Sequence, residues 1–195
     1  SFSILAGSPA ACSAADNPFT HPGILHSRAE LDFVKAKVAK GEEPWKSAWE
    51  ELRSHDISEL DWKPKPIADV VRGVRNHPDI GGTNLMRDGA AAYSHAIQWY
   101  VAAKQPHADK AVEILNAYAD TLKSIGGHDA RLLAGMAGIT FTNAAEIIRH
   151  TDAGRQGRQP NTSCRSVAVG ELCQKNELLR ACSTGNRDHE VHVSS

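Results

Sequence analysis

The sequence predicts an all-α fold built from antiparallel helical hairpins, and three observations lead to this prediction. Residues 129–149 carry apolar or small side chains on nearly every helical face, which is typical of a helix surrounded by other helices. Apolar residues also recur at helical spacing over residues 111–125, and only Gly126 and Gly127 separate this segment from the next one. No convincing alternation of apolar and polar residues, which would indicate a strand, occurs before residue 150.

The first two helices have clear boundaries in the sequence. Ser27 and Glu30 have the spacing of a capping box, in which each side chain accepts a hydrogen bond from the other residue's backbone N–H. The helix that follows is expected to end at Gly41, because glycine readily adopts the left-handed conformation found at helix ends. Pro44 then suits the first position of a second helix.

Two aromatic features follow these boundaries. Trp45 and Trp49 share one face of the second helix, and we interpret them as core residues, with sugar stacking as the alternative. Residues 54–83 form a long connection that is rich in proline and glycine, basic and partly aromatic. Such a connection suits an acidic polymer passing over it, although a solvated surface loop is the simpler interpretation.

The third helix is expected to run from Asn84, as its cap, to about Ala103. Asp88, His95 and Trp99 lie along one stripe of this helix, at positions i, i+7 and i+11. A carboxylate, an imidazole and an indole in a row are able to line a saccharide cleft. The alternative is a surface ion pair beside a half-buried tryptophan.

Several polar residues lie inside the last predicted helix, and they need an explanation because a buried polar group requires a hydrogen-bond partner or water. Asp129 is the expected N-cap, and Arg149 is a cation that suits the C-terminal end. The polar residues between them are Thr140, Thr142, Asn143 and Glu146. Satisfied hydrogen bonds in the core are the simpler interpretation, and a wet cleft is the alternative.

Length and charge limit the classes of function. The 195 residues suffice for one domain with a core, and the net charge of −1 gives no indication of a nucleic-acid partner. No apolar run approaches the roughly 20 residues that span a membrane, so no membrane partner is expected. Residues 1–15 resemble the remnant of a secretory signal peptide, and we expect a secreted, extracellular and monomeric protein.

The sequence changes character after about residue 153. Residues 16–153 hold the helical patterns, whereas residues 154–195 form a divergent tail that is polar, rich in arginine and irregular. The tail contains three cysteines, whose pairing the sequence leaves open, and two histidines near its end; the spacing of Cys173, Cys182, His189 and His192 fits no strong zinc pattern. We therefore expect no metal and no cofactor.

Three pieces of the sequence, over roughly residues 19–150, together resemble one known family. They are residues 21–26 (HPGILH) with Pro44-Trp45-Lys46; residues 88–93 (DGAAAY) with Ile97-Gln98-Trp99; and residues 108–118 (ADKAVEILNAY) with residues 133–135 (LAG) and 143–147 (NAAEI). In order and spacing these pieces resemble the alginate lyase domain family of polysaccharide lyases. The resemblance implies an (α/α) toroid, here an incomplete ring of helical hairpins around a cleft, and an acidic, uronate-containing polysaccharide as the substrate.

Lyases of this kind cleave by β-elimination, which sets chemical requirements for the site. The carboxylate charge of the sugar must be neutralised so that the anion formed after loss of the C5 proton is stabilised. A base must reach that proton and an acid must protonate the leaving oxygen. We expect His95 to be the base and Asn84, Trp99, Arg131 and Asn143 to contact the substrate, with Arg131 meeting a sugar carboxylate or, alternatively, pairing with Asp129 or Glu146.

The chain departs from the family after Arg149. Family members continue with further inner helices that carry a motif with Asn and His and a later Tyr, and the tail has no counterpart of these. The main hypothesis is a secreted polysaccharide lyase in a truncated or divergent form. The alternatives are a carbohydrate-binding or scaffold protein without catalysis, and an unstable fragment in which the apolar flanks of residues 129–149 are exposed.

Overall fold

The computed structural model describes residues 20–73 and 78–151, and this part of the chain is mainly α-helical. The domain boundaries predicted at residues 15 and 154, and everything predicted for residues 1–15 and 154–195, lie outside the described residues. The helices are α1 (Arg28–Lys40), α2 (Trp45–Ser54), α3 (Gly82–Ala102), α4 (Gln105–Thr121) and α5 (Ala130–His150), with a 3₁₀ turn, η1 (Asp56–Ser58).

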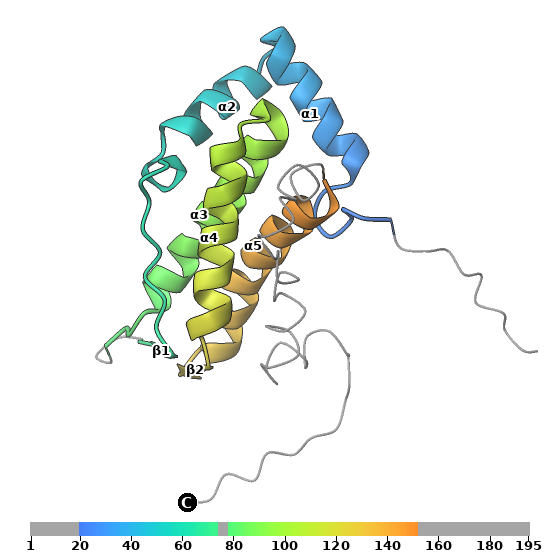
Figure 1. The fold of residues 1–195 in the computed structure, drawn as a ribbon. Coiled ribbons are helices and arrows are strands. Elements are labelled where there is room, and N and C mark those ends of the chain that lie inside the picture. The colour runs from blue at the N-terminus through green and yellow to red at the C-terminus, as the bar shows by residue number, and fades with distance from the viewer. Residues whose placement is uncertain (1–19, 74–77, 152–195) are drawn as a thin grey trace, which may run out of the picture.

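The three long helices form the centre of the molecule. α3, α4 and α5 lie side by side with α4 antiparallel to the other two, and α1 and α2 lie across one end of this group (Figure 1). Residues 103–104 join α3 to α4 and residues 122–129 join α4 to α5, so these neighbours are hairpins as predicted. However, α4 ends at Thr121, and the prediction that its helical pattern continues to Ile125 is wrong. The core lies between these helices; its largest fully buried apolar side chains are Leu85, Ile114, Leu115, Tyr118, Leu133 and Ile147.

Two short strands correct the prediction that no strand occurs before residue 150. β1 (Asp69–Arg72) pairs in parallel with β2 (Ser124–Gly127), and Val70 lies opposite Ile125. Both of these residues are buried. Each strand has only four residues, which is too short for an alternating pattern to stand out in the sequence.

The predicted boundaries of α1 are confirmed. The Ser27 Oγ atom accepts a hydrogen bond from the Glu30 N–H at 3.3 Å, and Glu30 Oε2 accepts one from the Ser27 N–H at 2.8 Å. Gly41 ends the helix with a φ of 68° and donates its N–H to the Val38 carbonyl. Both helix ends could be predicted from the sequence because each depends on residues only a few positions apart.

The prediction that Trp45 and Trp49 are core residues is wrong. No residue of α2 is buried, because α2 packs mainly against the amphipathic α1 at the end of the group. Trp45 meets the edge of Phe33 at 5.5 Å and lies 5.1 Å below the ammonium of Lys37. The guanidinium of Arg53 lies 5.9 Å from the centre of the Trp49 ring, so both indoles pack against cations.

The start of α3 also differs from the prediction. Gly81 is the N-cap, in a left-handed conformation with φ 77°, and Asn84 lies in the first turn of the helix. The Asp79 carboxylate provides the capping acceptor that was expected from Asn84. It accepts hydrogen bonds from both the N–H and the hydroxyl of Thr83 at 2.9 Å. An acceptor a few residues upstream thus stabilises the exposed N–H groups of this helix.

α5 is covered on one face and exposed on the other. Leu133, Ala137 and Phe141 are buried against α3 and α4. Its opposite face exposes a row of large apolar side chains: Leu132 (54%), Met136 (46%) and Ile139 (49%). The prediction that other helices surround α5 on all sides is therefore wrong for the described residues, and the exposed row agrees with the apolar flank that the sequence led us to expect.

The connection over residues 54–83 is less irregular than predicted, because it contains η1 and β1 and buries Ser58 and Val70.

Among the described residues, no helix combines the length and the apolar character that crossing a membrane requires.

Candidate functional site

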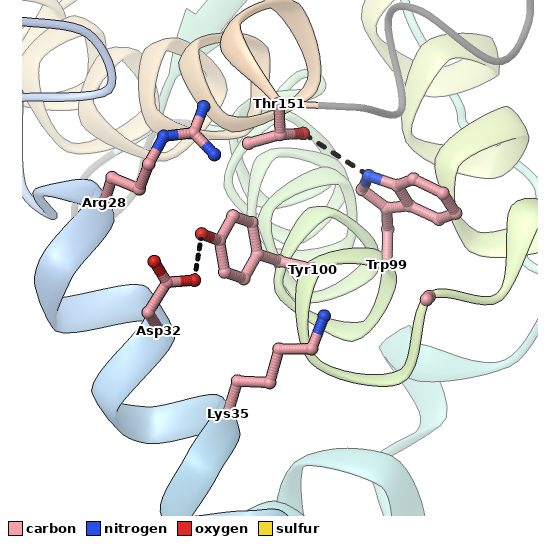
Figure 2. A pocket seen from close by; sticks show the side chains of 7 residues that line it. Arg28, Asp32, Lys35, Trp99, Tyr100 and Thr151 are labelled. Atoms are coloured by element: carbon pink, nitrogen blue, oxygen red, sulfur yellow. Dashed lines mark hydrogen bonds between the residues drawn. The ribbon is translucent and has the colours of Figure 1, made fainter.

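A polar pocket of about 200 Å³ lies where α1 meets the C-terminal ends of α3 and α5. Figure 2 shows the side chains that line it: Arg28, Asp32 and Lys35 from α1, Trp99 and Tyr100 from α3, and Thr151 just beyond α5. Residues 28, 32 and 35 share one face of α1, because positions separated by three and four residues lie above one another on a helix. Exposed charged groups thus form one wall of the pocket, and buried aromatic rings form the other.

Tyr100 connects the two walls of the pocket. Its hydroxyl donates a hydrogen bond to Asp32 Oδ1 at 2.7 Å, and the Lys35 ammonium lies 5.7 Å from the centre of its ring. Burial, together with the hydrogen bond to the Asp32 carboxylate, raises the pKa of Tyr100 to about 12. The phenol is therefore a proton donor at neutral pH rather than a base.

Arg28 and Trp99 join the pocket to the C-terminal end of α5. One Arg28 Nη atom donates to the His150 carbonyl at 2.5 Å, at the helix end where a positive charge is stabilising. Trp99 Nε1 donates to Thr151 Oγ1 at 3.4 Å, which orients the indole along the pocket wall. Arg28 and Lys35 outnumber the single carboxylate of Asp32, so the lining favours an anionic group.

His95 lies away from this pocket, in the interior of the molecule. Its side chain is fully buried, and its Nδ1 atom lies 2.8 Å from Nδ1 of His107, in a hydrogen bond whose donor depends on the tautomer. Burial, followed by the positive charges of His107 and Lys110, lowers the pKa of His95 to about 4. The ring is neutral at pH 7, but a substrate on the surface has no access to it.

The stripe that joins His95 to Asp88 and Trp99 is not on the surface. Asp88 is buried, and its carboxylate accepts hydrogen bonds from Trp62 Nε1 at 2.9 Å, the Lys65 N–H at 2.7 Å and the Tyr118 hydroxyl at 2.7 Å. The expectation of a surface ion pair is wrong, because the connection over residues 54–83 folds over this part of α3. Asp88 holds that connection against the helix.

Asn143 has its hydrogen bonds satisfied within the structure. It is buried on α5, accepts a hydrogen bond from the Leu25 N–H at 3.0 Å and donates one to the Ile139 carbonyl at 2.7 Å. The simpler interpretation, a satisfied polar group in the core, is confirmed for this residue. Asn143 fastens the segment that precedes α1 to α5.

The other two predicted substrate contacts lie far from the pocket. Asn84 is half-buried in the first turn of α3, and Arg131 is exposed in the first turn of α5. Twenty residues of helix separate Arg131 from Thr151, which corresponds to about 30 Å along the axis. Neither expected partner pairs with Arg131 in the described part of the chain: Asp129 contacts His128, and Glu146 contacts His21 and His150.

Of the five predicted site residues, the pocket therefore contains only Trp99. Sequence reasoning missed Arg28, Lys35 and the role of Tyr100. The available signal was three charged residues at helical spacing on the face of α1 that also carries the buried Leu31, but such spacing is also typical of any solvated helix face.

Comparison with known proteins finds no relative of this chain. No protein-family model, no curated protein and no solved structure matches the chain.

Proposed function

We propose that this chain is a secreted protein that acts on uronate-containing polysaccharide in the manner of a β-eliminating lyase, and that an acidic sugar unit binds in the pocket beside α1. The observation that carries the proposal is the joint presence of exposed Arg28 and Lys35 and the indole of Trp99 around one pocket. Guanidinium and ammonium groups pair with sugar carboxylates, and the mostly buried Trp99 indole gives the pocket an apolar wall.

The arrangement of the helices supports the same proposal. Antiparallel hairpins with short links are the units of an (α/α) toroid, and we propose that α3, α4 and α5 are part of an incomplete one. The exposed apolar row on α5 is the kind of surface that a further hairpin of such a ring would cover. A toroid is also the architecture that the sequence resemblance to the alginate lyase domain family implies.

The reaction itself sets the roles that the pocket has to provide. A base removes the C5 proton, its electron pair forms the C4–C5 double bond, and the C4–O bond breaks while the leaving oxygen takes up a proton. Arg28 is suited to neutralise the sugar carboxylate, and the protonated Tyr100 is suited to supply the proton to the leaving oxygen. Buried His95 is not suited to be the base.

A second candidate function follows from that last point. The burial of His95 leaves the pocket without the base that we expected, which favours a protein that binds acidic polysaccharide without cleaving it. Both candidates use the same pocket and the same ligand, and they differ only in turnover.

Absorbance and calorimetry on the purified chain test the proposal. Turnover of alginate or another polyuronate would give an unsaturated product that absorbs in the near ultraviolet, whereas heat of binding without absorbance would identify the second candidate. In either case the Arg28→Gln variant should bind a short polyuronate about tenfold more weakly, because one charge-assisted contact is lost.

Arg131→Gln is the matched control, since it removes the same charge from an exposed site about 30 Å away. Equal affinities of the Arg28→Gln variant and the unmodified chain, with loss of binding in the Arg131→Gln variant, would refute the assignment of the pocket. Absence of both binding and turnover on all polyuronates would refute the function.

A further inference from the structure

A cluster of two histidines and one glutamate lies at the C-terminal end of α5, and none of its residues lines the pocket. His21 comes from the segment before α1, and Glu146 and His150 come from successive turns of α5. One ligand atom from each of the three side chains lies within 4.8 Å of the other two. Three groups that bind metals well therefore converge from parts of the chain about 125 residues apart.

We propose that His21, Glu146 and His150 form a binding site for a divalent transition metal, with Zn²⁺ as the best match. Two imidazoles and one carboxylate are a ligand set that zinc prefers, and three protein ligands leave a fourth position for water. Calcium and magnesium prefer sites made of oxygen atoms, so the two nitrogen ligands argue against them.

The present contacts already approach the geometry that zinc needs. His21 Nδ1 lies 2.5 Å from Glu146 Oε1, and His150 Nε2 lies 3.7 Å from Glu146 Oε2. With bonds of about 2.0–2.2 Å in a tetrahedron, neighbouring ligand atoms lie roughly 3.3 Å apart. Small rotations of the side chains, which open the first contact and close the second, would therefore admit the ion.

The surroundings hold the ligands in place. The His21 and His150 rings stack with their centres 4.1 Å apart, and Glu146 is mostly buried, with 11% of its side chain exposed. The hydrogen bond from the Leu25 N–H to Asn143 fixes the segment that carries His21 to the same helix.

A metal here would join the segment before α1 to the last turn of α5. The pocket lies next to this junction, because Arg28 donates to the carbonyl of His150 itself. The site is therefore a structural clamp that holds the α1 wall of the pocket against α5, and its loss should loosen this wall without disturbing the centre of the core.

Calorimetric titration of the dialysed full chain with Zn²⁺ tests the site, alongside the variants His150→Ala and His21→Ala. The full chain should bind with a dissociation constant in the micromolar range or tighter, and each variant should bind this zinc at least about tenfold more weakly, since one of three ligands is lost. Zinc should also raise the melting temperature of the unmodified chain more than that of either variant.

His128→Ala is the matched control, because His128 is an exposed histidine that also contacts a carboxylate, Asp129, but has no third ligand in the described cluster. This variant should bind zinc as the unmodified chain does. His21 lies outside the helices, so its variant decides the question if the His150→Ala variant has lost its helical circular dichroism. Zinc affinity that is unchanged in the His21→Ala variant, or absent from the unmodified chain, would overturn the proposal.

Discussion

The two halves of α3 carry polar side chains for different purposes. In the first half, Asp88 is enclosed and accepts hydrogen bonds from Trp62, Lys65 and Tyr118. At the other end, Trp99 and Tyr100 face a pocket whose far wall is the charged face of α1 (Figure 2). The same helix thus has a buried hydrogen-bond acceptor with a structural role in one half and a candidate binding surface in the other. The role of each half depends on the elements that pack against it.

This difference predicts that changes in the first half mainly affect stability, whereas changes at the pocket mainly affect binding. The largest effect is expected for Asp88→Ala, which should lower the free energy of unfolding by about 3–4 kcal/mol, because three donors lose a buried carboxylate acceptor. Chemical denaturation checks this value. Asp120→Ala, at an exposed position of α4, should change it by less than about 0.5 kcal/mol, and similar losses in both variants would contradict the comparison.

The close contact between α3 and α5 provides the second test. A Cβ atom added at Gly89 would lie 2.4 Å from Thr140 Oγ1 and 2.9 Å from Phe141 Cε2, so Gly89→Ala should cost about 1–3 kcal/mol. Gly135 also lies within a helix, but nothing lies within 4 Å of its added Cβ atom. Gly135→Ala should therefore stabilise the protein by about 0.5–1 kcal/mol, and thermal unfolding should shift in opposite directions for the two variants.

The buried His95 predicts a third effect, on the pH dependence of stability. Its pKa is lowered from 6.5 to about 4 on folding, so the unfolded chain binds the additional proton between these values. The contribution of neutral His95 to the free energy of unfolding is thus fully present above about pH 6.5 and decreases as the pH falls toward 4. Because of this group, the free energy of unfolding should fall by about 1–2 kcal/mol between pH 7 and pH 5.

The His95→Asn variant isolates this effect. Its free energy of unfolding should fall less steeply over the same pH interval, whatever its absolute stability, when denaturation curves are measured at pH 7 and pH 5. An unchanged slope would mean that the His95 ring is accessible to protons in the folded state.

The smallest effect on stability is expected at the pocket. Arg28 is exposed, so Arg28→Gln should change the free energy of unfolding by only about 0.5 kcal/mol, mostly through the lost contact with the His150 carbonyl. The expected tenfold loss of polyuronate affinity corresponds to about 1.4 kcal/mol of binding free energy, which is larger than this change in stability. A stability loss comparable to that of Asp88→Ala would show that the pocket wall is structural.

The sequence predicted the local features of the fold and missed the contacts between distant segments. The capping box of Ser27 and Glu30 and the helix end at Gly41 were predictable, because each depends on neighbouring residues. The covering of Asp88 was not, since its partners Trp62 and Lys65 come from a connection that showed no regular pattern. A stripe of polar residues on a helix does not reveal what packs against it.

The candidate site was predictable only in part for the same reason. Trp99 was identified from its position on α3. Arg28 and Lys35 precede it by more than sixty residues, and they become pocket residues only because α1 packs against α3. Exposure likewise depends on the folded chain. His95 and Trp99 lie one turn apart on the same stripe, yet only Trp99 lines the pocket.

The most direct test of this comparison is a titration of isotope-labelled protein with a short polyuronate, followed through the indole N–H resonances in NMR spectra. Trp99 Nε1 donates to Thr151 at the pocket, and Trp62 Nε1 donates to Asp88 in the first half of α3. The Trp99 resonance should shift with added ligand while the Trp62 resonance stays in place. A shift of Trp62 alone, or of neither resonance at saturating ligand, would contradict the assignment of the pocket as the binding surface.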